Sequence, residues 1–301
     1  MSALTYATAQ ILRVVPRAQV GQALGRLADV RWSAGVGRAV VGLYSRVYDV
    51  ELGECKSDGW SSFDAFFTRG LRDGVRPVDP DPRAYVSPAD GCLASMGRVD
   101  EKSTWLVKGR PYRVDELLGS NEEARRYEGG LASVIYLSPR DYHRVHSPVG
   151  GVVRRVRSIP GDYYPVNSIG VRHVPNLFVR NRRVAIAIDS SPDSGLGTVT
   201  LVMVSAMIVG RITVGGIAAR DVPFGDHFLD RPVEKGGEIG VFHLGSTAVV
   251  FFPKEASARW TASEGPVRLG ERIAVSTHVP SPPAGEYPRD PRDPSRLQGV
   301  G

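Results

Sequence analysis

The chain has 301 residues, of which 42% are hydrophobic and 23% charged. This is the composition of a globular protein with a real core, either one large domain or one domain with appendages. A net charge of +6 and a pI near 9.4 favour an anionic partner such as nucleic acid, anionic lipid or a phosphorylated substrate. Two cysteines, Cys55 and Cys92, are too few for a disulfide framework or a Cys-rich metal site. We expect both to be small buried residues in a reducing compartment.

No apolar run reaches the roughly 18 residues that a membrane-spanning helix needs. The first apolar stretch is interrupted by Arg13 and Arg17 and lacks the pattern of a secretory signal. We therefore expect a protein that is soluble or lies on a membrane without crossing it.

The first fifty residues predict amphipathic helices, with apolar residues recurring every three or four positions. The two apolar stripes are Val20, Leu24, Leu27, Val30 and Val36, Val40, Leu43, Val47. The basic residues of this region are Arg13, Arg17, Arg26, Arg31, Arg38 and Arg46, opposed before Asp49 only by Asp29. Such helices can lie in a membrane interface, where each arginine near an anionic surface contributes about 1 kcal/mol. They can equally pack on the main domain with solvated arginines, and the pattern alone does not decide.

Most of the remaining chain predicts strands. Residues 62–71 (Ser-Phe-Asp-Ala-Phe-Phe-Thr-Arg-Gly-Leu) form a short aromatic element, and a proline-rich connector follows over 76–88. Short apolar runs separated by glycine and proline then predict strands at 131–137, 151–159, 183–189, 198–209, 248–252 and 272–276. The tail 280–301 is rich in proline, arginine and aspartate, and we expect it to be disordered. The predicted fold is therefore α+β: a helical appendage over 1–58, a mostly β core of hybrid sandwich or barrel type over 59–279, and the tail.

Two stretches before residue 150 hold candidate acid–base residues. Asp90 lies in Ser-Pro-Ala-Asp-Gly (87–91), where Asp-Gly usually marks only a turn. His143 and His146 lie three residues apart among arginines, and His-x-x-His without a third ligand at recognisable spacing is a weak metal signal. A histidine suits proton transfer equally well. Asp90, His146 and Ser246 occur in an order that an Asp–His–Ser relay allows.

Gly245 and Ser246 interrupt an apolar run in Leu-Gly-Ser-Thr (244–247). The usual interpretation is a hairpin turn between two strands. A second interpretation starts from Gly245, which has no Cβ and leaves its carbonyl open to attack by the next side chain. A Gly-Ser bond held in a strained turn can pass its acyl group to the serine oxygen.

These motifs, taken together, resemble those of the phosphatidylserine decarboxylase family. Leu-Gly-Ser-Thr, preceded by Lys-Gly-Gly-Glu (235–238), is similar to that family's self-cleavage segment. The other motifs follow in the family's order and spacing: the aromatic segment at Phe63, then 87–91, 142–148, 161–167, 174–181 and 204–210. The resemblance covers most of residues 60–253. Ser205 stands where a glycine is expected, a change between two small residues.

The resemblance implies a chain that cuts itself between Gly245 and Ser246, with Asp90, His146 and Ser246 as the processing triad. Ser246 becomes a covalent pyruvoyl group, the cofactor, and no metal is required. The implied reaction converts phosphatidylserine to phosphatidylethanolamine, with His143 as a candidate for acid–base work on the substrate.

The implied partner is phosphatidylserine in an anionic membrane surface rather than nucleic acid. The implied location is peripheral, on the cytoplasmic side of the cell membrane. The two cleaved chains stay together as a heterodimer, and a higher oligomer of that pair is compatible with the resemblance.

The candidate substrate residues are Tyr136, Arg140, Asn167 and Phe178. Further candidates are Arg144, Arg180 and Arg182 for the lipid phosphate and Met207 and Ile208 for an acyl path.

Three rival interpretations remain at this stage. A serine hydrolase could use Ser246, His146 and Asp90 without chain cleavage, although Ser246 lacks a Gly-x-Ser-x-Gly elbow. A β-rich binding module would explain the charge, although its core lacks an aromatic-and-basic stripe of the RNA-binding type. A zinc hydrolase built on His143 and His146 would lose activity with chelators, whereas a pyruvoyl enzyme would not.

Overall fold

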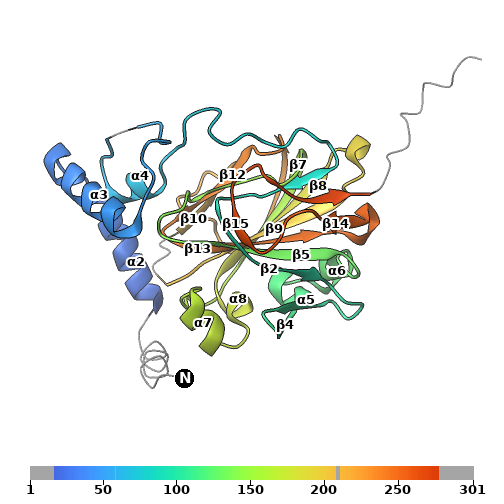
Figure 1. Cartoon of the computed structure of the whole chain (residues 1–301). Helices are drawn as coiled ribbons and strands as arrows, with labels where there is room; N and C mark the ends of the chain where they lie inside the picture. Colours follow the sequence, from blue (N-terminus) through green and yellow to red (C-terminus); the bar gives the residue numbers. More distant parts are fainter. Residues whose placement is uncertain (1–16, 58, 208–210, 278–301) are drawn as a thin grey trace, which may run out of the picture.

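A computed structural model describes residues 17–57, 59–207 and 211–277, in which a β core carries helices at one end and along one face (Figure 1). The part of the first predicted helix before residue 17, and the predicted tail 280–301, lie outside the described residues. The predicted α+β class with a mostly β core is confirmed, since antiparallel sheets make up most of the described chain.

The main sheet contains eight antiparallel strands, in the order β11-β7-β8-β9-β13-β5-β2-β15. Their bounds are β2 (Gly91–Arg98), β5 (Leu131–Leu137), β7 (Gly151–Ile159), β8 (Arg183–Ser190), β9 (Thr198–Val204), β11 (Gly225–Val233), β13 (Ser246–Phe252) and β15 (Gly265–Val267). The predicted bounds of β5 and β7 are confirmed. The prediction that β9 continues to residue 209 is wrong, because the carbonyl of Ser205 accepts a side-chain hydrogen bond from Asn181 instead of a strand partner.

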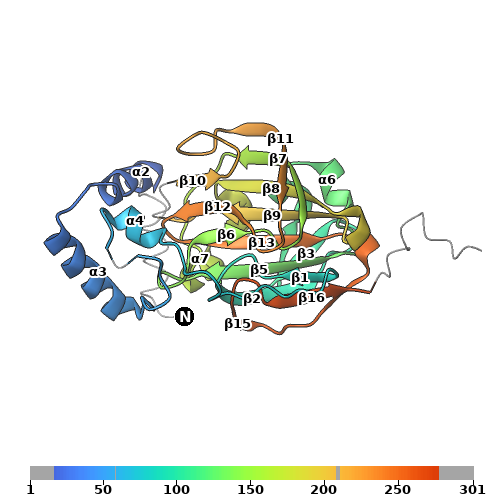
Figure 2. The same ribbon diagram turned by 90° about the horizontal axis from the view of Figure 1, so that it is seen from above.

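Two smaller sheets and a hairpin complete the β structure (Figure 2). The sheet β10-β12-β6 contains β10 (Arg211–Val214), β12 (Glu238–His243) and β6 (Arg144–His146). The sheet β1-β16-β14 contains β1 (Ala84–Val86), β16 (Arg272–Ser276) and β14 (Ala258–Trp260), and β3 (Thr104–Val107) pairs with β4 (Arg110–Arg113). Although β12 and β13 follow one another in the chain, they belong to different sheets. The interpretation of Gly245-Ser246 as a hairpin turn is therefore wrong: the chain turns a corner there from the small sheet into the large one.

Short helices cover one face of the main sheet, below it in Figure 1. They are α5 (Val114–Leu118), α6 (Asn121–Arg125), α7 (Ser168–His173) and α8 (Leu177–Arg180), and the 3₁₀ turns η1 (Pro192–Ser194) and η2 (Lys254–Ala256) connect strands. From Thr247 to Phe252, β13 is buried on both faces. Phe251 packs against Trp105 and Tyr127, and Phe252 packs against Tyr85. Truncating either phenylalanine would cost about 3–5 kcal/mol.

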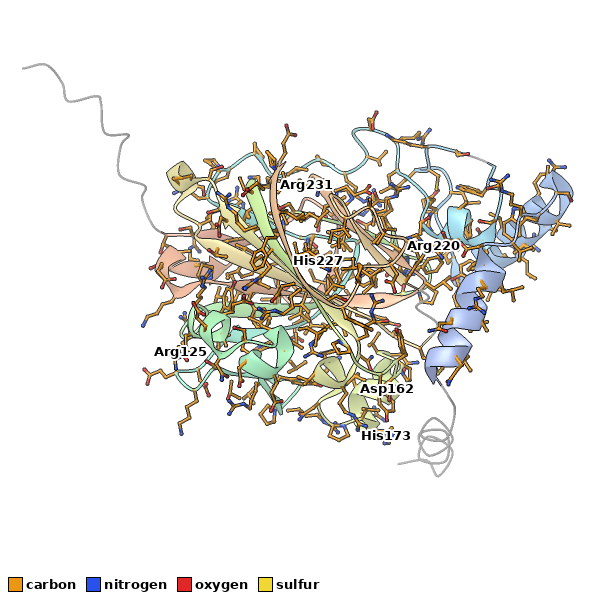
Figure 3. The ribbon with its side chains drawn as sticks, turned by 180° about the vertical axis from the view of Figure 1, so that it is seen from behind. Arg125, Asp162, His173, Arg220, His227 and Arg231 are labelled. Carbon is orange, nitrogen blue, oxygen red and sulfur yellow. The ribbon has the colours of Figure 1, made fainter. Side chains whose placement is uncertain are left out.

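At one end of the core lie α2 (Arg17–Ala28), α3 (Ala34–Tyr48) and α4 (Phe63–Phe67), as Figure 1 shows. Ser62 caps the N-terminus of α4, because its Oγ accepts a hydrogen bond from the Ala65 amide at 3.1 Å. An ion-pair network joins α2 to the core, because Asp29 binds Arg211 at 2.9 Å and also Arg220, on the side of the core facing these helices (Figure 3).

The predicted apolar stripes of α2 and α3 lie largely on the surface. The exposed fractions are 66% for Leu27, 62% for Leu43 and 65% for Val47. α3 instead packs inward through Gly37 and Val41. None of the helices within the described residues is long and apolar enough to span a membrane.

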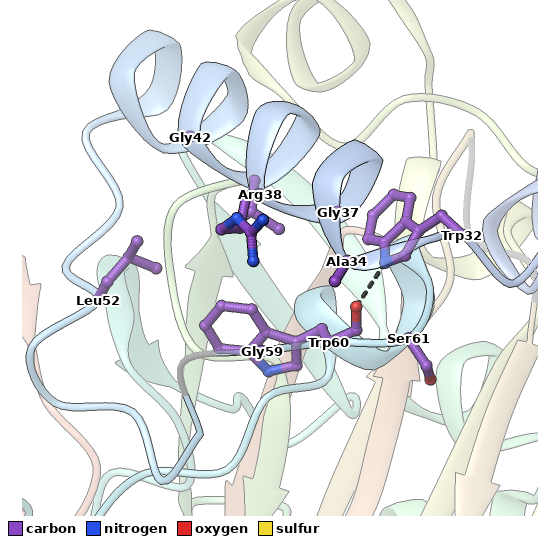
Figure 4. A pocket seen from close by; sticks show the side chains of 10 residues that line it. Trp32, Ala34, Gly37, Arg38, Gly42, Leu52, Gly59, Trp60 and Ser61 are labelled. Carbon is purple, nitrogen blue, oxygen red and sulfur yellow. Dashed lines mark hydrogen bonds between the residues drawn. The ribbon is translucent and has the colours of Figure 1, made fainter.

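A cavity of about 740 Å³ separates part of α3 from residues 59–61 (Figure 4). The Trp32 indole donates to the Trp60 carbonyl at its edge, and Arg38 extends into the cavity toward Trp60. Gly37 permits the indole of Trp32 to lie close to α3, since a Cβ on Gly37 would lie 2.8 Å from the Trp32 Nε1.

The prediction that both cysteines are buried is correct for Cys55 and wrong for Cys92, which is exposed. Cys92 lies near the start of β2, where its side chain borders a cavity instead of packing in the core.

Gly270 offers a test of this packing. Its φ is +85°, and a Cβ would lie 2.6 Å from the Pro77 carbonyl oxygen. Gly270→Ala should lower the free energy of unfolding by about 2–4 kcal/mol, combining left-handed strain with overpacking. Gly109→Ala is the control, because Gly109 has φ +77° but free space around a Cβ, and it should cost only about 1 kcal/mol. Urea denaturation measures both, and equal losses would contradict the packing argument.

Candidate active site

The corner between β12 and β13 consists of Leu244 and Gly245. Both have positive φ, +83° and +27°, which in a leucine costs roughly 1–2 kcal/mol. A Cβ on Gly245 would meet no atom within 4 Å, so the corner is open on that side. Ser246 then begins β13, opposite Leu137 of β5, and Thr247 pairs on both sides, with Val204 and Tyr136. The Gly245–Ser246 bond thus joins an open, strained corner to a strand held by two neighbours.

Two cavities flank this bond. Leu244 and Gly245 line the first, of about 270 Å³, which we call the corner cavity. Its other lining residues are Tyr44 and Tyr48 of α3, Phe63 and Phe67 of α4, and Tyr136, Leu137, Pro139, Pro165, Val166, Asn167, Ala206 and Met207. The second, of about 300 Å³, borders Thr247 and extends to Phe178 and Cys92. Both cavities share Tyr136, Val166 and Asn167, so they adjoin one another, with Gly245 lining the first and Thr247 the second.

Of the two motif histidines, His143 is the nearer to the corner, whereas His243 ends β12 directly before Leu244. Its carbonyl accepts a hydrogen bond from the Phe242 amide at 3.0 Å, and Phe242 precedes Gly245 by three residues. The imidazole is fully buried, with its ring centroid 4.0 Å from that of Phe67. Phe67 belongs to the same apolar cluster as Leu244.

The tautomer of His143 follows from its contacts. Its Nδ1 lies 2.8 Å from the Asp141 carbonyl oxygen, which can only accept, so Nδ1 carries the hydrogen and Nε2 holds a lone pair. Among the described residues, this buried Nε2 has no hydrogen-bond partner. Burial, and then the positive charge of Arg69, lower the pKa of His143 to about 3. His143 is therefore a neutral imidazole with an available lone pair.

His146 lies at the other end of β12, in register with Glu238. Its Nδ1 donates to the Gly236 carbonyl at 2.7 Å, and its Nε2 accepts from the Tyr142 hydroxyl at 3.1 Å. Burial lowers the pKa of His146 and raises that of Tyr142, so the imidazole is neutral and the phenol remains a donor. In this conformation, the lone pair of His146 is already engaged.

Asp90 lies in the same neighbourhood as His146, whose amide donates to the Pro88 carbonyl at 2.8 Å. The Asp90 carboxylate accepts hydrogen bonds from Arg76 at 2.7 and 3.0 Å and from the Leu269 amide at 2.8 Å. Within the described residues no hydrogen bond joins Asp90 to His146. The predicted relay partners are thus close in the fold but are not linked as they stand.

The candidate substrate residues divide into two groups. Tyr136 and Asn167 line both cavities, and Phe178 lines the second. Arg140 instead borders a separate charged cavity of about 420 Å³ beside Asp90. The other candidate arginines already have protein partners: Arg144 pairs with Glu238 at 3.0 Å, Arg180 stacks on Tyr164 at 4.8 Å, and Arg182 pairs with Asp221 at 2.7 Å. Met207 lines the corner cavity, and Ile208 lies outside the described residues.

Sequence reasoning missed the aromatic wall of the corner cavity and the partners of the acid–base residues. Phe63 and Phe67 belong to the aromatic segment that carried the family resemblance without a role, and Arg76 begins the connector that follows it. On pattern alone, an aromatic helix face indicates core packing, so no signal distinguished the wall from the core. Tyr142 lies in the histidine motif, but only the fold brings its hydroxyl to His146.

The described residues contain no cluster of three side chains able to hold a metal ion. His146 Nε2 already accepts from the Tyr142 hydroxyl, so of the two Nε2 atoms only that of His143 lacks a hydrogen-bond partner among the described residues.

Comparisons with known proteins agree on the family. The phosphatidylserine decarboxylase family model matches residues 63–275. A phosphatidylserine decarboxylase proenzyme of Myxococcus xanthus is 36% identical over 282 residues, covering 89% of this chain and 98% of its own. Those of Bordetella pertussis (37% identity, 87% of this chain and 92% of its own) and Marinobacter nauticus (36%, 86% and 93%) are similarly close.

These matches place the chain among the pyruvoyl-dependent carboxy-lyases, which are made as proenzymes. Within that class, the chain belongs to the phosphatidylserine decarboxylase family. The corner fits a pyruvoyl group made from Ser246, because the space beside Gly245 and the cavities on both sides leave room for a ketone and for a substrate that reaches it.

The low pKa of His143 predicts acid sensitivity of the uncut protein. In the unfolded chain, His143 binds a proton below its ordinary pKa of 6.5. In the folded chain, it stays neutral until the pH approaches its lowered pKa of about 3. The free energy of unfolding should therefore fall as pH drops from 6.5, by up to about 1.4 kcal/mol per pH unit for this group. Urea denaturation of Ser246→Ala at pH 7.5, 6 and 5 measures the slope. Adding His143→Gln should make the slope shallower, and an unchanged slope would contradict the assignment.

Proposed function

We propose that this chain cuts its own Gly245–Ser246 bond, converts Ser246 into a pyruvoyl group, and decarboxylates phosphatidylserine to phosphatidylethanolamine. The observation that carries the proposal is the position of the Gly-Ser bond. It lies at an open corner with positive φ, lines a cavity, and continues directly into a strand that is held on both sides. Catalysis by an internal serine requires a bond that is both exposed to attack and fixed in place.

In the processing step, Ser246 Oγ attacks the Gly245 carbonyl carbon while a neighbouring base takes the hydroxyl proton. The amide C–N bond breaks, its nitrogen gains a proton, and an ester replaces the peptide bond. Removal of the Ser246 α-proton then expels the Gly245 carboxylate and leaves dehydroalanine, which tautomerises and loses ammonia to water. The products are a chain ending at Gly245 and a chain beginning with a pyruvoyl group at position 246.

We assign the base of the processing step to His146, supported by Asp90. The proximity of the two residues supports this pairing, and the carboxylate charge favours a protonated His146. For His146 to act, the Tyr142 hydroxyl must leave Nε2, and the imidazole must approach Ser246 from the other end of β12. Freeing Nε2 costs about one hydrogen bond, roughly 1 kcal/mol.

We assign proton transfer during decarboxylation to His143. The pyruvoyl ketone supplies the electron sink for loss of carbon dioxide. The lone pair on His143 Nε2 can take a proton from the substrate ammonium and return it to the carbon that carbon dioxide leaves. Tyr136 and Asn167, which line both cavities, are positioned to hold the headgroup.

The surface beside the corner cavity supports a peripheral location on an anionic membrane surface, which we assign to the cytoplasmic side of the cell membrane. Outward-facing Leu43 and Val47 of α3 lie among exposed arginines, an arrangement typical of helices in an anionic interface. Tyr44 and Tyr48 of the same helix line the corner cavity, so a lipid leaving the membrane along α3 would meet the site. We accordingly assign residues 1–58 to membrane association and 59–279 to catalysis, with the two cleaved chains held together.

Intact masses test self-cleavage. The purified protein should give two chains split after Gly245, the smaller one lighter than simple hydrolysis predicts by the difference between serine and pyruvoyl. Ser246→Ala should remain a single chain, and His146→Gln should be cut at least about 100-fold more slowly, the usual contribution of a general base. The His143→Gln variant should still cleave itself but should decarboxylate phosphatidylserine slowly. A single unmodified chain in the parent protein would contradict the proposal and leave a serine hydrolase.

Vesicle flotation tests the membrane surface. The double variant Leu43→Asp, Val47→Asp should lose most binding to vesicles containing anionic phospholipid, because it removes apolar area and adds negative charge. Phe228→Asp is the matched control, since Phe228 is 76% exposed but lies on β11. Parent binding should weaken as salt rises. Equal loss in both variants would argue against α3 as the docking surface.

A further inference from the structure

Arg69 lies just beyond α4 and is almost fully buried, with an exposed fraction of 4%. Its Nη2 donates to two consecutive backbone carbonyls, those of Arg140 at 2.7 Å and Asp141 at 3.2 Å. The Asp141 carbonyl is also the acceptor for His143 Nδ1, at 2.8 Å. A guanidinium and an imidazole thus share one carbonyl oxygen.

The segment that carries Arg69 surrounds His143 with three consecutive residues. The Phe67 ring lies against the imidazole with centroids 4.0 Å apart. The Thr68 carbonyl accepts from Arg144 Nε at 2.9 Å, which fixes the residue after His143. Arg69 fixes the carbonyl of Asp141, two residues before His143. The loop that presents His143 is therefore held on both sides by residues 67–69.

The shared carbonyl sets the chemistry of His143. As long as Asp141 O accepts from Nδ1, the imidazole hydrogen stays there and the lone pair stays on Nε2. Burial and then the Arg69 charge oppose protonation of the imidazole and lower its pKa. The guanidinium borders the charged cavity that Asp49, Glu51 and Glu54 also line, but it makes no ion pair among the described residues.

The other titratable or charged groups around this loop have partners of their own or are neutral, so none of them replaces the effect of the Arg69 charge on His143. Asp141 binds Ser138 and Arg140 through its carboxylate, Arg144 pairs with Glu238, and Tyr142 donates to His146. From α3, Tyr44 donates to the Pro139 carbonyl at 3.1 Å. Cys55 lies beside Arg69, and burial raises the pKa of its thiol, so it stays neutral. His243 faces Asp64 at 2.8 Å.

We propose that Arg69 is a positioning residue that acts through the Asp141 carbonyl to keep His143 neutral, with its lone pair on Nε2. The proposal deepens the function assigned above to His143 and rests on it. Arg69 touches neither Ser246 nor the corner cavity among the contacts of the described residues, so its effect is exerted on the imidazole.

The test is the ¹⁵N spectrum of the histidine side chains in the uncut Ser246→Ala chain, with His143 assigned from His143→Gln. Arg69→Gln removes the charge, and Arg69→Met removes charge and donors in a side chain suited to burial. In either folded variant, His143 should show mixed tautomers and an imidazolium fraction at pH 5 at least about tenfold above the parent. Arg69→Lys, which keeps the charge and a donor, should restore the parent spectrum.

Arg98→Gln is the matched control, because Arg98 also donates to a backbone carbonyl, that of Gly129 at 2.7 Å, far along the chain from His143. It should leave His143 unchanged. A folded Arg69→Gln or Arg69→Met with the parent tautomer and titration would overturn the proposal. Because the spectra are taken on uncut protein without lipid, this failure is distinct from a parent enzyme that does not cleave itself or turn over phosphatidylserine.

Discussion

The ladder that holds β13 between β9 and β5 is the constraint on which the site depends. Thr247 to Phe251 pair on both sides, so the first residue of the strand, Ser246, has a fixed position relative to the main sheet. The preceding strand β12 belongs to another sheet, and only Leu244 and Gly245 span the step between them. A short connection between two fixed ends concentrates strain, and the positive φ of Leu244 is where it is visible. The strained geometry before the Gly245–Ser246 bond is thus a product of sheet topology.

The two histidines of the motif make the same backbone contact through Nδ1 but differ in the surroundings of Nε2. Each donates Nδ1–H to a backbone carbonyl, which leaves Nε2 as the only basic atom. On His146 that atom is occupied by the Tyr142 hydroxyl, and on His143 it is buried against the aromatic wall of α4. In a motif of two histidines three residues apart, one imidazole therefore has its lone pair engaged and the other, among the described residues, has it free, because the two positions meet different neighbours.

The sequence predicted local structure well and spatial partners poorly. β5, β7 and β16 were found because β-branched runs end at glycine or proline, a signal within the strand itself. From the sequence alone, Gly245 and Ser246 fit a hairpin turn. The pairing of β13 is set instead by β5 and β9, which are not its neighbours in the chain. The family motifs singled out Asp90, His146 and Ser246, yet the Arg76 that holds Asp90 and the Tyr142 that holds His146 follow only from the fold. For α3, the apolar stripe was visible in the sequence, but only the packing of Gly37 and Val41 shows that the stripe faces outward.

The position of β13 also decides what becomes of the chain once it is cut. The part after Gly245 contributes a central strand to the main sheet, the strand β15 at its edge, and β16, which pairs with β1. After the proposed cut, the smaller product would be interleaved with the larger one and could not leave without dismantling both sheets. Folding is unimolecular before the cut and would be bimolecular after it, so refolding of the mature protein depends on concentration, whereas folding of the precursor does not. If the chain is cut as proposed, the precursor folds with its two parts linked, and a mature enzyme that refolds poorly would depend on slow unfolding for its lifetime.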